Sequence, residues 1–430
     1  MKLIIIILTY TFGGLVRGAA LYGLSTVIIN MLQDSSKISF VTTNVVISLL
    51  STGCSMGSIV GTIIGPKIIQ KMGQIKALQM VSLITLAANI LMFPSIHWAY
   101  LFGLKIISGV SSVLLLTIIP LICMQQVDSK LRGIVGSLSN LNMWASMFIC
   151  NIIQYFICQS SKLYPISQIY PTVISVVMTI MSYIVKEQVK EQQTLSSSTI
   201  KNESIFQKQF KTCFIVAFSL GMSLGSTGFT PILQYSTLIF KNNFSSPKSG
   251  TIGAIITSGI SLMSCILALP FVKKYKRKLL ICLGQNTMMI CYIIMITVLY
   301  LQLNQAVSDT IILVTTIVYV IAYSFSTGSL FFVMMGEIYP PAIKSVFVNL
   351  TMGIHVTTLL IVTFVFPLLT QQQNYIIYFI WVLLDQILII KYVPETHNKK
   401  MEEITQIMIY KEHKITKKEL ILCQIEVCSK

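Results

Sequence analysis

A dozen long apolar stretches run through the 430-residue chain, and they limit what it can fold into. A helix needs roughly 20 residues to cross about 30 Å of hydrocarbon, and runs of that length are too long for the strands of a membrane barrel. The sequence therefore predicts twelve membrane-spanning helices in an all-α membrane protein. Their expected ranges are 3–31, 42–65, 76–95, 99–123, 134–158, 166–185, 211–235, 251–272, 279–301, 309–334, 345–369 and 374–393.

The composition supports a lipid-facing surface. Hydrophobic residues make up 54% of the chain and charged residues only 10%. A soluble domain usually carries about 25% charged residues, so the apolar excess must face a lipid bilayer. The net charge of +17 lies in the gaps between apolar runs, and no aromatic-rich basic domain accompanies it. We therefore expect no nucleic-acid partner.

Positive charge in the gaps predicts the topology. Gaps that follow even-numbered spans are rich in lysine and arginine, whereas the opposite gaps hold only Lys37, Lys162, Lys241 and Lys248. The positive-inside rule then places both termini in the cytosol, and we expect a plasma-membrane location. The sequon at Asn243 falls in an outward gap, which predicts glycosylation there.

The order of spans and polar segments predicts two halves. A polar stretch rich in serine, threonine and glutamine separates six spans from six. Basic turns recur at matching places in the two sets, as a duplicated six-helix unit predicts. The expected division is 1–185 for the first half, 186–210 for a cytosolic linker, 211–393 for the second half and 394–430 for a cytosolic tail.

The motifs of enzymes and metal sites are missing. No Cys-x-x-Cys, no phosphate-binding GxxxxGK[ST] loop and no nucleophile constellation occur, so we expect no enzyme activity, no cofactor and no metal. Ionisable groups inside spans are costly and usually face a cavity, although each can also be structural. These groups are Arg17, Lys105, Glu337, His355 and Asp385. The first span has no carboxylate, which argues against proton coupling through it.

Small and polar residues inside the spans suggest packing and binding. Gly53, Gly57, Gly61 and Gly65 recur every four residues, which favours close approach of another helix. A small polar solute needs fixed hydrogen-bond donors and acceptors with an aromatic face beside them. The candidates are Asn140, Asn142, Trp144, Thr227, Thr230, Gln234, Phe331, Phe332 and His355, each of which can equally serve helix packing.

Several segments resemble the sugar porter branch of the major facilitator superfamily, and within it the insect facilitated trehalose transporters. Val393-Pro394-Glu395-Thr396, followed by Lys399 and Glu403, resembles the PETKGxxLEEI signature after the last span. Further matches are Met335-Gly336-Glu337-Ile338-Tyr339-Pro340 with Lys344, Leu131-Arg132-Gly133, Gly73, and Tyr235-Ser236 with Ile239-Phe240.

The resemblance implies a twelve-helix major facilitator fold of two pseudo-symmetric six-helix bundles. It also implies facilitated diffusion of a sugar by alternating access. The residues that it assigns to substrate binding are Asn140, Thr230, Gln234, Phe332 and His355, to which we add Arg17. The residues assigned to the gate and its support are Gly73, Lys105, Gln125, Arg132, Gly133, Glu337, Lys344 and Glu395.

The chain departs from the family pattern at both sites. Gln125 replaces the family's glutamate before the LRG turn, and Gln70, Gln74 and Lys273 also replace charged gate residues, which implies an inner gate weaker by roughly 1–3 kcal/mol. Leu224 and Gly225 replace the glutamine pair of the seventh span, and no PESP motif follows the sixth. An organic-anion carrier and a non-transporting, sensor-like paralogue therefore stay open as alternatives.

Overall fold

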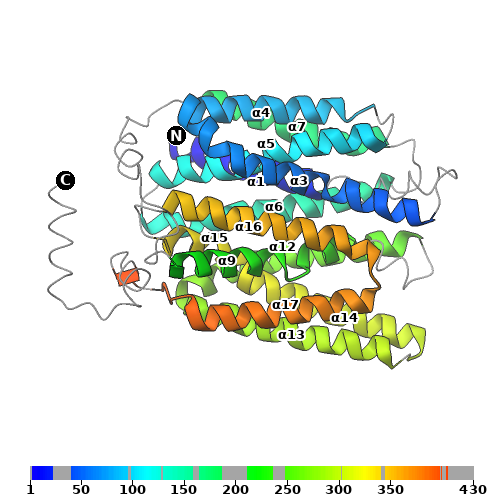
Figure 1. Ribbon diagram of the computed structural model, residues 1–430. Helices are drawn as coiled ribbons and strands as arrows, with labels where there is room; N and C mark the ends of the chain where they lie inside the picture. Colours follow the sequence, from blue (N-terminus) through cyan, green and yellow to red (C-terminus); the bar gives the residue numbers. More distant parts are fainter. Residues whose placement is uncertain are drawn as a thin grey trace.

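The computed structural model describes residues 2–22, 40–94, 98–126, 129–157, 164–185, 211–235, 247–301, 303–339, 344–397, 399 and 403–404. All the secondary-structure elements within these ranges are helical, which confirms the expected all-α class. The long helices lie side by side as one bundle (Figure 1). The linker 186–210, Asn243 and most of the tail lie outside the described residues.

Six long helices form the first half. They are α1 (Lys2–Tyr22), α3 (Phe40–Met72), α4 (Gln74–Leu91), α5 (Trp98–Gln126), α6 (Ser129–Ile157) and α7 (Tyr164–Ile184). Each matches one predicted span. The boundary between α3 and α4 is Gly73, whose φ of +80° is a conformation that residues with a Cβ rarely adopt. A single residue therefore turns the chain between two antiparallel helices.

The second half also follows the predicted spans, but two of them are interrupted. Its elements are α9 (Lys211–Gly225), α10 (Phe229–Gln234), α12 (Pro247–Lys274), α13 (Arg277–Tyr300), α14 (Gln305–Tyr323), η3 (Ser324–Gly328), α15 (Ser329–Glu337), α16 (Lys344–Val365), η4 (Phe366–Leu368) and α17 (Gln371–Tyr392). The seventh span is divided between α9 and α10. The tenth is divided between α14 and α15 by the π-helical turn η3.

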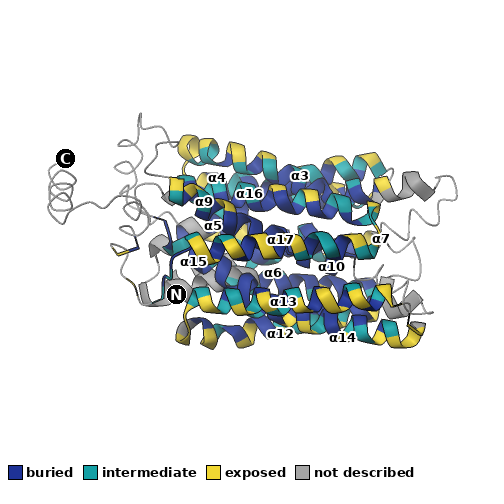
Figure 2. Ribbon diagram, turned by 60° about the horizontal axis from the view of Figure 1, so that its bottom comes forward, coloured by how far each residue is buried: buried dark blue, intermediate teal, exposed yellow. Residues whose placement is uncertain are grey.

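The arrangement suits a membrane. Within the described residues, ten helical stretches are long and apolar enough to cross one. Exposed residues follow the outer faces of helices such as α12 and α13 (Figure 2), and many of them are large and apolar, Ile63 and Phe156 among them. The start of α1 and the end of α17 lie at the same end of the bundle (Figure 1), as an even number of spans requires.

The glycine stripe of α3 packs closely on α5, as the sequence predicts. A Cβ on Gly57 would overlap the Ile106 carbonyl, and a Cβ on Gly109 would overlap the Cys54 carbonyl. The two backbones therefore touch at reciprocal glycines. The two halves meet where α3 packs on α16 and α6 packs on α12.

Candidate functional site

The break in the seventh span exposes backbone groups inside the bundle. Gly228 has a φ of +75°, and a Cβ there would overlap the Tyr378 ring, so only glycine fits. The helix stops at Gly225, and the Thr227 carbonyl leaves the helical hydrogen-bond ladder. It accepts hydrogen bonds from the hydroxyls of Tyr292 and, at 2.6 Å, of Tyr319. Two tyrosines of α13 and α14 thus hold the break open.

The tenth span has its own irregular turn. Ser329, the first residue of α15, donates from its Oγ to the Ser324 carbonyl of η3 at 2.5 Å, and the Ser326 Oγ donates to the Ala322 carbonyl of α14 at 2.6 Å. Isolated π-helical turns frequently occur at functional sites. Transporters bind solutes where two spanning helices are interrupted near the middle of the bilayer. The irregular turns of the seventh and tenth spans make this region the candidate solute site.

An aromatic cluster joins the two breaks. Phe229, the first residue of α10, stacks on Tyr323 at the end of α14, with ring centroids 3.7 Å apart and planes 13° apart. The Trp144 ring of α6 meets Phe229 edge to face, with centroids 4.9 Å apart. The aromatic cluster of Trp144, Phe229, Tyr319 and Tyr323 therefore includes residues of both halves. Its rings can face the C–H groups of a sugar.

Several buried polar atoms have no hydrogen-bond partner among the described residues. Thr227 Oγ1, Ser324 Oγ and Thr327 Oγ1 belong to the two irregular turns. His355 Nδ1 and Asn142 Nδ2 are further atoms of this kind. Unpaired buried polar groups are costly, and a solute hydroxyl or a water that binds them would remove that cost. A sugar hydroxyl can both donate to and accept from such groups.

The other predicted binding residues occupy different surroundings. His355 of α16 lies beside Phe331, with ring centroids 5.8 Å apart, whereas Phe332 meets Phe331 edge to face. Gln234, at the end of α10, donates to the Ser51 carbonyl at 3.3 Å and so ties the second half to α3. Thr230 is buried in α10. The side chain of Asn140 lies outside the described residues.

Arg17 is buried in the first half, where its partners are neutral. The guanidinium donates to the Ser58 hydroxyl at 2.7 Å and to the Ser112 hydroxyl at 2.9 Å. These bonds connect α1 to α3 and α5. Arg17 also lies within electrostatic range of His355, across the boundary between the halves. Arg17 can therefore connect helices of the first half and also lie near a solute bound between the halves.

Two predicted gate residues of the second half, Glu337 and Glu395, belong to one network. Glu337, the last residue of α15, forms an ion pair with Arg277, the first residue of α13. The Glu395 carboxylate accepts hydrogen bonds from the backbone N–H groups of Arg277 and Lys278, at 3.0 and 3.1 Å. An anion at a helix N-terminus meets unpaired N–H groups and the positive end of the helix dipole. The segment 394–397, after α17, is thereby connected to α13 and, through Arg277, to α15.

The remaining gate predictions have separate outcomes. Gly73 is the turn between α3 and α4. Lys105 is buried in α5, where its Nζ donates to the Ala20 carbonyl at 3.1 Å. The side chains of Gln125, Arg132, Gly133 and Lys344 lie outside the described residues. Within the described residues, no group of three or more His, Cys, Asp or Glu could hold a metal ion.

Sequence reasoning did not single out Arg277, which pairs with the predicted gate residue Glu337, or the rings of Phe229, Tyr319 and Tyr323. A signal for the breaks was present, because both read Ser-Thr-Gly, at Ser226-Thr227-Gly228 and Ser326-Thr327-Gly328. The same tripeptide at Ser51-Thr52-Gly53 lies inside the continuous helix α3. The tripeptide alone therefore does not predict a break.

Comparisons with known proteins agree with this geometry. A family model described as sugar (and other) transporter matches residues 10–189 and 184–408. The glucose transporter GlcP of Staphylococcus epidermidis is 22% identical over 387 residues, covering 81% of this chain and 85% of the relative. The facilitated trehalose transporter Tret1 of Bombyx mori is 25% identical over 221 residues, covering 49% of this chain and 44% of the relative.

Solved structures share the fold. A crystal structure of a D-xylose-proton symporter superposes with a TM-score of 0.79 at 20% identity, covering 93% of this chain and all of that one. An inward-open conformation of the xylose transporter XylE from E. coli gives a TM-score of 0.75 at the same identity, covering 94% of this chain and 99% of that one. The described helices therefore have the major facilitator arrangement.

Proposed function

Because the chain belongs to the sugar (and other) transporter family, and so is a multi-pass membrane transporter, we propose that it moves a sugar of the trehalose or hexose class by facilitated diffusion. The halves rock about a central site that opens to one side at a time. The observation that carries the proposal is the meeting of two interrupted spans at an aromatic cluster, with unpaired hydroxyls beside it.

We assign a role to each group of residues from the geometry of the site. The rings of Phe229 and Trp144 offer an apolar face to the sugar ring. The hydroxyls of Thr227, Ser324 and Thr327 bind sugar hydroxyls. Thr230, Phe332 and His355 complete the wall of the site from α10, α15 and α16. No carboxylate lies in the described part of α1, which supports movement without proton coupling through that helix.

Gating and orientation complete the proposal. The network of Arg277, Glu337 and Glu395 holds the terminal end of the second half, and Arg132 and Lys344 act with it at the inner gate. Both termini and the linker 186–210 face the cytosol, and the protein resides in the plasma membrane with Asn243 glycosylated outside. The Gln substitutions near the gate favour easier opening on the cytosolic side.

Uptake of labelled trehalose and glucose into oocytes tests the proposal. We expect saturable uptake that a proton gradient does not change. Phe229→Leu removes a ring of the aromatic cluster and should lower uptake at least tenfold. Phe218→Leu, on the exposed face of α9, is the matched control and should leave uptake unchanged. No sugar uptake despite surface expression would overturn the proposal and favour the sensor-like paralogue.

An organic-anion carrier is the second candidate. Arg17 supports it, because the hydrogen-bonding partners of its charge among the described residues are neutral. This function requires uptake of a labelled small organic anion that Arg17→Leu abolishes. Surface expression of Arg17→Leu must be measured beside uptake, because the variant also removes the bonds that connect α1 to α3 and α5. Loss of anion uptake with sugar uptake retained per expressed molecule would favour the anion carrier.

A further inference from the structure

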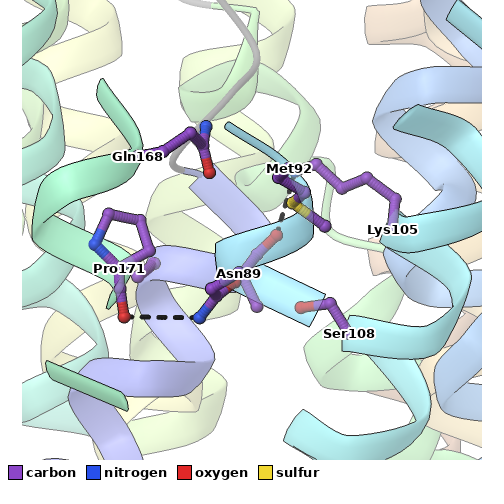
Figure 3. Close-up of a pocket in the computed structure, with 8 residues that line it drawn as sticks. Asn89, Met92, Lys105, Ser108, Gln168 and Pro171 are labelled. Carbon is purple, nitrogen blue, oxygen red and sulfur yellow. Dashed lines mark hydrogen bonds between the residues drawn. The ribbon is translucent and has the colours of Figure 1, made fainter. Parts of the chain in front are cut away.

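A small cavity in the first half has no place in the sugar pathway proposed above. Four helices of that half alone form it, namely α1, α4, α5 and α7 (Figure 3). Its polar lining consists of Asn89, Lys105, Ser108 and Gln168, each more than nine-tenths buried. About 220 Å³ of empty space, part of it open solvent, lies beside these residues, and the centre has room for one water molecule or one small ion.

Lys105 has no counter-charge in this cavity. An ammonium offers three donors, and the described hydrogen bond to the Ala20 carbonyl uses one. Among the described residues, no carboxylate forms an ion pair with Lys105. The sequence gives the reason, because Asp34 and Asp128 are the only acidic residues between 1 and 185. Both lie outside the described residues.

A second cation lies close to the first. Arg17 contacts the Cys54 thiol at 3.8 Å, and Lys105 packs against the preceding residue, Gly53. Arg17 is itself a cation, so it adds to the positive charge near Lys105. Burying one unpaired cation is expensive, and burying two in one low-dielectric core is more so. A small anion beside Lys105 would lower this cost, and the described residues of the first half supply none.

We propose that the cavity binds one small monovalent anion, of the size of chloride, against Lys105 Nζ. The Ser108 hydroxyl and the Gln168 amide are further donors that line the space; the amide N–H has only a 3.4 Å contact, to the Ser167 hydroxyl. The Asn89 amide is already used by the Pro171 carbonyl and the Ser175 hydroxyl, and it fixes α4 against α7. The narrow centre excludes a sugar and a lipid headgroup.

Thermal unfolding of the purified full-length protein in detergent, without sugar, tests the anion site. We expect chloride to raise the midpoint saturably over gluconate at constant sodium and ionic strength, because a ligand that binds only the folded state stabilises it. Bromide should act like chloride and appear in anomalous diffraction beside Lys105 Nζ. Lys105→Met should abolish the chloride response. Lys67→Met, which removes an exposed lysine of α3, should retain it.

Two more variants keep the test decisive if Lys105→Met does not fold. Ser108→Asp supplies an internal carboxylate, so its midpoint should no longer depend on chloride. Asp34→Asn should respond to chloride as the unaltered protein does. Equal unfolding midpoints in chloride and gluconate would overturn the proposal. So would a chloride response that Lys105→Met retains, or one that only Asp34→Asn shows. Sugar is absent throughout, so failure of sugar uptake would not affect the result.

Discussion

Phe229 stacks on Tyr323 with 3.7 Å between ring centroids, so the break in the seventh span lies directly against the irregular turn of the tenth. Each irregularity removes backbone groups from the helical ladder, which is tolerated inside a membrane protein only where they are buried or line a cavity. The stacked rings cover one side of this backbone. From another side, the hydroxyls of Tyr292 and Tyr319 donate hydrogen bonds to the Thr227 carbonyl.

The shared acceptor predicts non-additive effects for the two tyrosines. Tyr292→Phe and Tyr319→Phe should each lower the free energy of unfolding by about 0.5–1.5 kcal/mol, because the carbonyl keeps one partner. The double variant should lower the free energy of unfolding by about 1–3 kcal/mol more than the sum of the two single effects, since it leaves a buried carbonyl unpaired. Chemical or thermal unfolding in detergent measures this coupling. Additive losses would show that water or another group takes over the carbonyl.

Thr227→Val separates binding from folding at the same place. The Thr227 hydroxyl is buried and has no partner among the described residues, so valine of similar shape should leave the unfolding midpoint unchanged or raise it. If a sugar uses this hydroxyl, the KM for uptake should rise severalfold while surface expression stays constant. A lowered midpoint with an unchanged KM would assign the hydroxyl to folding.

The α3–α5 contact predicts a sharp difference between two glycines of one helix. Gly109→Ala places a methyl group on the Cys54 carbonyl and should destabilise the protein by about 1–3 kcal/mol through overpacking. Gly103→Ala meets nothing within 4 Å and should be neutral or stabilising by up to about 1 kcal/mol, because alanine favours a helix. Unfolding midpoints compare them directly. A tolerated Gly109→Ala would mean that the two helices can separate without cost.

The sequence predicted the long helices well, because apolar length and basic turns report directly on the bilayer. The expected span 76–95 is α4, Gln74–Leu91, and 374–393 is α17, Gln371–Tyr392. The glycine stripe also predicted its own packing. The breaks escaped prediction, because the surrounding aromatic and apolar residues keep the mean hydropathy of a continuous span. Only tertiary partners such as Tyr378, which packs against Gly228, distinguish the break from the same tripeptide in α3.

The network of Arg277, Glu337 and Glu395 was predicted only in part. Glu337 and Glu395 were identified through the motifs that they share with the family. Their meeting point, Arg277, was not, because the sequence presents it as one of several basic residues in a turn. Which lysine or arginine of a basic turn reaches a carboxylate depends on the packing of α13 against α15 and the tail. No periodicity in the sequence encodes that choice.

The gate network predicts unequal contributions from its two carboxylates. Glu395→Ala removes the anion from the N-terminus of α13 and should cost about 0.5–2 kcal/mol, as loss of a helix cap does. The Arg277–Glu337 pair is partly exposed, so a double-mutant cycle with Arg277→Met and Glu337→Gln should yield a coupling of about 1 kcal/mol or less. Unfolding midpoints in low and high salt measure both effects. Equal costs at the two carboxylates would contradict this ranking.

At Asp385 we predict the opposite behaviour, because a double substitution should destabilise the protein less than either single substitution. The Asp385 carboxylate is buried in α17 and accepts hydrogen bonds from Gln285 Nε2 at 2.6 Å and from the Ser219 hydroxyl at 3.1 Å. Asp385→Leu leaves the Gln285 amide N–H without its acceptor, and the Oε1 of the same amide has no partner among the described residues. The substitution should therefore lower the free energy of unfolding by about 1–3 kcal/mol. Gln285→Met leaves the carboxylate without its shorter hydrogen bond and should cost at least as much.

The double variant Asp385→Leu with Gln285→Met should recover most of the loss, because both members of the pair are then apolar and of similar shape. The Ser219 hydroxyl can turn to a carbonyl of its own helix, as serines in membrane helices do. Unfolding midpoints of the four proteins decide the matter. A double variant less stable than either single one would show that Asp385 has a further partner, such as a bound cation, that the Gln285 and Ser219 contacts do not account for.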